Sequence, residues 1–211
     1  MDAIVQHLPE LALAGALAWG AGLRLYLVVF GLGLAGAYGW LPLPEHLRLL
    51  ANPVVVGAAG FMAFVELFAD KLPWLDSLWD GLQTFVRIPA GAALAAGVFG
   101  DSGAGIALAA ALLGGSVTAA THFSKAGARA AANTSPEPFS NLGLSFAEDA
   151  LVLGGSWLAI THPLVFLVLL AVFLVVAAVL LSWLVRGFRR LFGGRNRHAG
   201  TPRGPGQADP R

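Results

Sequence analysis

The chain has 211 residues, of which 57% are hydrophobic and 12% are charged, with a mean hydropathy of +0.73 and a formal net charge of +1. Soluble domains carry about 25% charged residues, so this composition excludes an ordinary soluble domain and predicts a polytopic membrane protein. The absence of cysteine excludes disulfides, thiolate metal sites and cysteine nucleophiles.

Long apolar stretches predict the membrane spans, because a helix needs about 20 residues to cross the bilayer core. We predict an all-α, polytopic transmembrane helical bundle with six spans, at residues 11–38, 51–69, 84–100, 104–121, 138–160 and 163–185. The last span is the clearest, since it contains no charged residue. Residues 1–185 would form the membrane domain, and residues 186–211, rich in Gly, Pro and Arg, a basic disordered tail.

The first span contains one charged residue, Arg24, shortly after the run Gly20-Ala21-Gly22. This span is either one tilted helix or a helix broken near the glycines. In both cases Arg24 lies at membrane depth. The alternative is an arginine that reaches up to the interface from a span beginning near Leu25.

A second group of charges begins at the end of the second predicted span. Several of its members fit one helical stripe, with a kink or break at Pro73. Two tryptophans in residues 64–80 indicate a membrane interface, where the acids of a surface helix would be solvated. Alternatively, Glu66 and Asp70 form part of an ion or proton site. The charged residues concerned are Glu66, Asp70, Lys71, Asp76, Asp80 and Arg87.

The most polar stretch, residues 121–149, predicts a helical hairpin with facing charges. At helical spacing, one arm has a basic face and the other an acidic face. Between them, Ser135 has the properties of an N-cap before Pro136. We expect Lys125 and Arg129 to face the acids of the second arm, and Arg24 to meet Glu66 or Asp70. The two faces comprise His122, Lys125, Arg129 and Asn133, and Glu137, Asn141, Ser145 and Glu148, and Asp149 follows directly after the second.

Six spans would place both termini on one side of the membrane. The arginines of the tail predict that this side is the cytoplasm, beside the anionic lipids of the inner (plasma) membrane. The motif Ala-Gly-x-Arg occurs at Arg24 and again at Arg129, which would fit a 3+3 inverted repeat with broken or re-entrant helices. Gly- and Ala-rich faces could support a homo-oligomer. The tail lacks the features of a nucleic-acid-binding segment, so we expect no such partner.

Two long segments carry a resemblance to a known family. They are FVELFADKLPWLDSLWDGLQTFVRIPAGA and THFSKAGARAAANTSPEPFSNLGLSFAED, at residues 64–92 and 121–149. Together they resemble a bacterial integral-membrane family known as domain of unknown function 4126, over about residues 10 to 185. The resemblance implies a membrane location and no particular activity.

Three functions fit the sequence. An unpaired charge at the bilayer centre costs roughly 2.5–3.5 kcal/mol or more, so charges kept there pair with one another or line a pathway. We favour a transporter or carrier in which Glu148 and Asp149, with Glu66 and Asp70, bind a proton or cation. Arg24, Lys125 and Arg129 would then hold an anionic group, and the helix start at Ser135 offers a further anion site.

The alternatives are a charge-paired scaffold without substrate and a lipid-modifying membrane enzyme. Direct contact between Arg129 and Glu148 in a dry bundle would favour the scaffold, whereas a water-filled gap would favour a pathway. An enzyme could use Asp76 and Asp80 to hold Mg²⁺, but the sequence shows no nucleophile beside a base and no cofactor motif. We therefore expect no cofactor, no metal site and no catalytic residue.

Overall fold

Helices form at each place where the sequence predicts a span. The computed structural model describes residues 6–69, 73–132 and 138–193, and these contain helices and no strand. The all-α prediction is therefore confirmed for the described part of the chain. The elements are α2 (Leu8–Ala37), η1 (Glu45–Ala51), α3 (Pro53–Ala69), α4 (Pro73–Val98), η2 (Gly100–Ser102), α5 (Ala104–Ala132), α6 (Pro138–Thr161) and α7 (Pro163–Gly193).

Three of the described helices are long and apolar enough to cross a membrane: α2, α5 and the 21 residues of α7 that end at Trp183. A fourth span results if η1 and α3, bent by 68° at their junction, count as one. The membrane character is thus supported, but the count of six spans is not confirmed. Three of the predicted spans lack the length or the apolar character of a clear membrane span: α3 has only 17 residues, and α4 and α6 carry several of the charged side chains.

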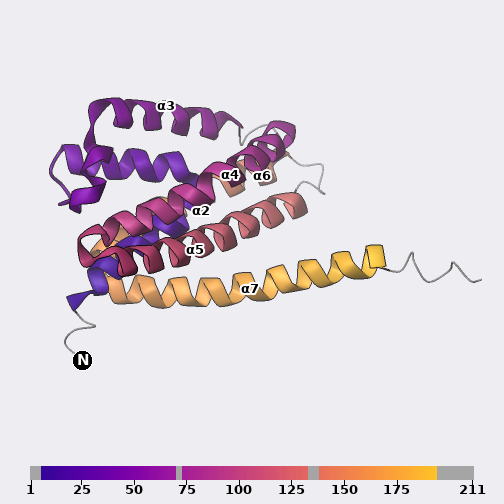
Figure 1. Ribbon diagram of the computed structural model, residues 1–211. Helices are drawn as coiled ribbons and strands as arrows, with labels where there is room; N and C mark the ends of the chain where they lie inside the picture. Colours follow the sequence, from indigo (N-terminus) through magenta and orange to yellow (C-terminus); the bar gives the residue numbers. More distant parts are fainter. Residues whose placement is uncertain (1–5, 70–72, 133–137, 194–211) are drawn as a thin grey trace, which may run out of the picture.

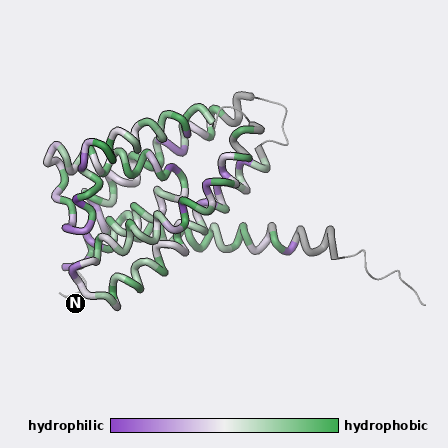
Figure 2. Tube along the Cα trace, turned by 45° about the horizontal axis from the view of Figure 1, so that its top comes forward, coloured by the Kyte–Doolittle hydropathy of each residue, from purple (hydrophilic) through white to green (hydrophobic). Residues whose placement is uncertain are grey.

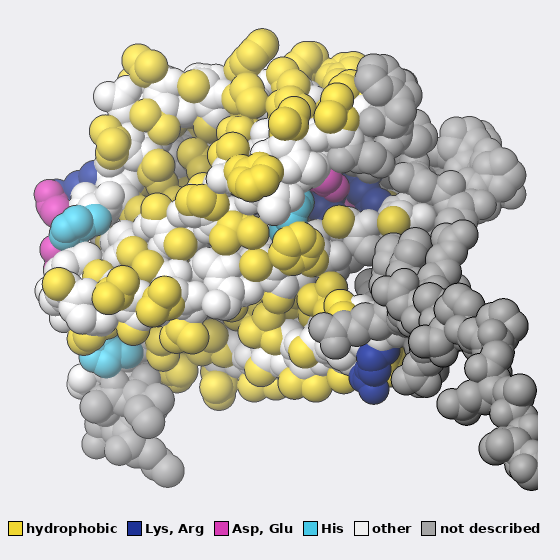
Figure 3. Space-filling view, turned by 45° about the vertical axis from the view of Figure 1, so that its right-hand side comes forward, with side chains coloured by type: hydrophobic (Ala, Val, Ile, Leu, Met, Phe, Trp, Pro, Cys, Tyr) yellow, Lys and Arg dark blue, Asp and Glu magenta, His cyan; other side chains and the backbone are white. Residues whose placement is uncertain are grey.

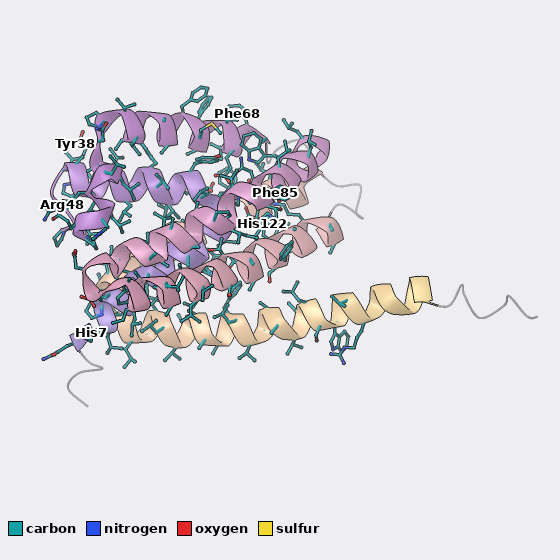
Figure 4. All side chains as sticks on the ribbon, viewed as in Figure 1. His7, Tyr38, Arg48, Phe68, Phe85 and His122 are labelled. Carbon is teal, nitrogen blue, oxygen red and sulfur yellow. The ribbon has the colours of Figure 1, made fainter. Side chains whose placement is uncertain are left out.

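Helix α2 is broken at Arg24, where φ is −145° and ψ is 75°. A Cβ atom on Gly20 would lie 2.7 Å from the Val28 side chain, although eight residues of straight helix would separate them by about 12 Å. The two halves therefore fold back on each other, and His7 and Tyr38, at the two ends of α2, lie at the same end of the bundle (Figure 4). Of the two alternatives that the sequence leaves open, one tilted helix or a helix broken near the glycines, the structure shows the broken helix. Arg24 is 2% exposed, so it does not reach for the interface.

The remaining helices alternate in direction. Helices α3, α5 and α7 run toward one end of the bundle, and α4 and α6 run back (Figure 1). Because α2 returns to the end from which it starts, the described chain begins at one end of the bundle and finishes at the other. The predicted placement of both termini on one side is not confirmed, and neither is the inverted repeat.

Small residues bring α4 and α5 into close contact in the interior. Thr118 on α5 is fully buried and donates a hydrogen bond of 2.8 Å to the carbonyl oxygen of Ala18 on α2. At Gly114 a Cβ atom would lie 2.4 Å from the Cβ atom of Ala95. Most of the helix surface is apolar, and Figure 2 shows hydrophilic residues among the packed helices and at the connections. Small side chains are the usual means of close helix packing in lipid.

The substitution Gly114→Ala is expected to lower the free energy of unfolding by about 1–3 kcal/mol, because the added methyl group overpacks the contact between α4 and α5. The measurement is thermal unfolding of the purified protein in detergent. Gly105→Ala on the same helix is the control, since no atom lies within 4 Å of the added Cβ there. Equal stability of the two variants would contradict the close packing.

Candidate functional site

Eight charged side chains from five helices meet in the half of the bundle where α3 and α5 end and α4 and α6 begin. Four are basic and four are acidic, so their formal charges balance. We call this set the charge network: Arg24 on α2, Glu66 on α3, Asp80 and Arg87 on α4, Lys125 and Arg129 on α5, and Glu148 and Asp149 on α6. Apart from Asp149, each is at most 7% exposed. Figure 3 shows basic and acidic atoms together in a recess of the apolar surface.

Arg87 joins α3 to α4. Its Nη1 donates to Asp80 Oδ1 at 2.9 Å, and its Nη2 donates to Glu66 Oε1. The sequence predicts all three residues on one helical stripe interrupted at Pro73. In the structure they lie on two antiparallel helices instead, and this is why Glu66 and Arg87 can face each other.

His122 extends this part of the network from α5. Its Nδ1 lies 3.3 Å from Arg87 Nη1, and its Nε2 lies 2.7 Å from Thr84 Oγ1. A guanidinium can only donate hydrogen bonds, so Nδ1 accepts and the ring proton resides on Nε2. That proton is then donated to Thr84, whose hydroxyl donates in turn to the Asp80 carbonyl oxygen at 3.0 Å. The contacts therefore require a neutral His122.

Glu148 is the acid with the most basic neighbours. Arg129 donates to both of its carboxylate oxygens, at 3.1 and 2.9 Å. Lys125 Nζ lies 3.3 Å from Glu148 and 3.7 Å from Asp80, and it donates to the Leu23 carbonyl oxygen at 3.0 Å. The expected facing of Lys125 and Arg129 with the acids of α6 is thus found. Lys125 links the two parts of the network and satisfies a backbone group beside the break in α2.

Arg24 lies at the break itself and binds α6. Its Nη2 donates to the carbonyl oxygen and to the hydroxyl of Ser145, at 3.2 and 2.8 Å. Its Nε lies 2.9 Å from Asp149 Oδ1 and 3.6 Å from Glu148 Oε2. The sequence does not predict these partners on α6; its predicted partners are Glu66 or Asp70, and Asp70 lies outside the described residues. Folding back of α2 places the break opposite the middle of α6.

Several predicted site residues cannot be located in this way. Asp70, Lys71, Asn133, Ser135 and Glu137 lie outside the described residues. Asp76 and Asn141 belong to α4 and α6, but their side chains are also outside the described part. The hypothesis that Asp76 and Asp80 hold Mg²⁺ is therefore untested. The Asp80 carboxylate is already paired with Arg87. No group of three or more His, Cys, Asp or Glu side chains suited to a metal ion occurs among the described residues.

Two contacts of the site were not foreseen. Gln83 is 6% exposed and donates to the hydroxyl of Tyr26 on α2 at 3.2 Å. Its position, three residues after Asp80 and four before Arg87, places it on the same helical stripe, so spacing alone could have included it. No sequence pattern indicates the contact of Lys125 with the Leu23 carbonyl, because a backbone acceptor becomes available only where the helix breaks.

Replacing Thr84 by valine is expected to cost about 1–3 kcal/mol of unfolding free energy, since the buried Nε2 proton of His122 loses its acceptor. Thermal unfolding in detergent measures the effect. Thr161→Val provides the same substitution at an exposed site where water can replace the lost bond, and we expect a change near zero there. An unchanged unfolding free energy in Thr84→Val would argue against the hydrogen bond between Thr84 and His122.

Residues 11–183 match the family described as domain of unknown function (DUF4126). No curated protein and no solved structure matches the chain. The matched region begins in the first half of α2 and includes the whole charge network. The chain therefore belongs to the DUF4126 family.

Proposed function

We propose that the protein is a small membrane carrier that moves a solute together with a proton or cation. The observation that supports this most directly is the break of α2 at buried Arg24, inside the charge network. In a bilayer, non-helical backbone is tolerated only where protein or a watery cavity surrounds it. Broken helices that bring charged groups to the middle of the membrane are a recurring feature of secondary transporters.

In this proposal the acids of α6 exchange partners during transport. Glu148 and Asp149 would take up the proton or cation, and Arg24, Lys125 and Arg129 would hold an anionic group or lock the acids. Lys125 suits such an exchange, since it lies within 4 Å of acids on both α4 and α6. A bound ion that neutralises Glu148 would leave Lys125 free to move toward Asp80.

The same proposal includes a topology of five crossings, by α3 to α7, with α2 entering and returning. The end of α7 carries exposed Arg186 and precedes an arginine-rich tail, which assigns that end to the cytoplasm by the positive-inside rule. The protein would lie in the inner (plasma) membrane, with anionic lipids beside the tail.

This topology predicts opposite labelling of two positions. The native chain has no cysteine, so Tyr38→Cys and Arg186→Cys each introduce a single thiol at an exposed site. A membrane-impermeant maleimide added to intact cells is expected to label Cys at position 38 and to reach position 186 only after permeabilisation. Labelling of both from the same side would contradict five crossings.

A charge-paired scaffold is the second candidate, and one observation favours it. Arg129 contacts Glu148 directly through two hydrogen bonds, and both side chains are buried. With four bases and four acids, the charge network is also neutral without any bound ion. The scaffold accounts for the pairing, but it gives no reason for a broken helix at the same place.

Reconstitution in liposomes separates the two candidates. A trapped pH indicator would report proton flux for the parent protein, Glu148→Gln, Asp149→Asn and, as control, the exposed Glu10→Gln. Loss of flux in Asp149→Asn with an unchanged melting temperature supports the carrier. A parent protein without flux, combined with loss of stability in Glu148→Gln, would refute the carrier and favour the scaffold.

A further inference from the structure

A cavity of about 270 Å³ lies beside the charge network, between α2, α3 and α6. Its lining joins two kinds of side chain. The charged ones are Arg24, Glu66 and Asp149, and the apolar ones include Leu27, Phe30, Phe64 and Leu153. Two of the apolar side chains, Phe64 and Leu153, are each 59% exposed on the outer surface of the bundle. The cavity therefore connects the buried charges with the surface that lipid chains would cover.

The charges of the lining favour a cation. Two carboxylates and one guanidinium line the cavity. Glu66 is paired with Arg87, which lies outside the lining, so Asp149 is the carboxylate that an entering cation would contact. Asp149 has a side chain that is 25% exposed, more than any other member of the charge network, and a ligand entering from the surface would meet it first. Phe30 and Phe64 also belong to the lining, and aromatic rings attract cations electrostatically.

The apolar part of the lining favours a ligand with a hydrocarbon body. A small hydrophilic cation would gain nothing from Leu27 and Leu153, whereas an alkyl chain or an aromatic body buries its surface against them at about 25 cal/mol per Å². Entry through a rim of exposed apolar side chains also suits a molecule that is already dissolved in the bilayer. Ligand pockets of this kind combine mostly apolar walls with a few convergent polar groups.

We propose that this cavity binds an amphiphile with a positively charged head group, whose head lies at Asp149 and whose apolar body extends past Phe64 and Leu153. The inference rests on the proposed carrier function, for which it names the class of substrate. The head could belong to a lipid with an amine head group or to a free lipophilic amine, because both present the same chemistry to Asp149.

Fluorescence quenching in vesicles tests the binding itself. Leu153→Cys, labelled with a fluorophore, reports on the rim of the cavity, and Val176→Cys on α7 is a matched position, 50% exposed and outside the lining. The probe is hexadecylammonium bearing a nitroxide, in phosphatidylcholine vesicles, and hexadecyl phosphate with the same nitroxide is its anionic counterpart. We expect saturable quenching by the cationic probe at position 153, and only the weaker, non-saturable quenching of bulk lipid at position 176.

Asp149→Asn should weaken binding of the cationic probe about tenfold, the effect of losing one charge-assisted contact. Unlabelled hexadecylamine and phosphatidylethanolamine are then added in separate competitions, and the stronger competitor identifies the free amine or the lipid as the source. Equal quenching at positions 153 and 176, or equal quenching by the anionic probe, would overturn the inference. Saturable binding without flux would support the amphiphile site and contradict the carrier function. Flux that is lost in Asp149→Asn, without binding of the probe, would support the carrier function and contradict the amphiphile site.

Discussion

Arg87→Leu is expected to lower the free energy of unfolding by about 3–5 kcal/mol, the usual cost of removing one partner from a buried ion pair. Arg87 is fully buried and donates to carboxylates on two helices, Glu66 and Asp80. Its removal leaves both acids in the interior without this cation, and His122 Nδ1 without its donor. The measurement is unfolding of the detergent-solubilised protein by titration with sodium dodecyl sulfate.

Two further variants show whether this cost comes from the buried pairs. Arg48→Leu removes an exposed arginine paired with Glu45, and such a surface pair contributes about 0–1 kcal/mol. The double variant Glu66→Gln with Arg87→Gln removes one charge of each sign, so it should be more stable than the sum of the single effects predicts. Strict additivity would show that Glu66 and Arg87 do not interact.

The second large effect is expected at Glu148. Glu148→Leu removes the acid that lies within 4 Å of Arg24, Lys125 and Arg129, and three buried cations then lose a common partner. We expect a loss of about 3–5 kcal/mol, measured by the same titration. Glu148→Gln should cost less, because the amide oxygen can still accept a hydrogen bond from Arg129.

The control for Glu148 is Glu10, which pairs with His7 at the exposed start of α2. Glu10→Leu should leave the unfolding free energy within about 1 kcal/mol of the parent value. A variant Glu148→Leu as stable as Glu10→Leu would mean that the three cations find other partners. That outcome would contradict the central place of Glu148 in the network.

Composition and spacing predicted much of the fold, because apolar length and helical periodicity are local properties. Each predicted span corresponds to a helix, and a break near the glycines of α2 was one of two alternatives that the sequence left open. What the sequence could not provide was the direction of the chain after that break. A tilted helix and a hairpin have the same composition, and only packing of Gly20 against Val28 distinguishes them. The predicted relation of the termini is not confirmed for this reason.

The sequence predicted which charged residues come together better than it predicted which of them pair. The residues at helical spacing, among them Arg129 and Glu148, do share one interior and do meet. The partners of Arg24 on α6 were not foreseen, since they depend on how α2 folds back. The interruption at Pro73 in the stripe from Glu66 to Arg87 was foreseen, but its antiparallel arrangement was not, because two antiparallel helices can present the same periodicity as one kinked helix.

The fold-back of α2 has a consequence for the order of assembly. Arg24 binds Ser145, which follows it by 121 residues, and the Leu23 carbonyl accepts from Lys125, 102 residues later. Neither contact can form until α5 and α6 have been synthesised and inserted. Helix α2 is therefore synthesised well before the helices that hold Arg24 and Leu23, and until those helices insert, Arg24 needs water, lipid head groups or the insertion machinery as a substitute for Ser145.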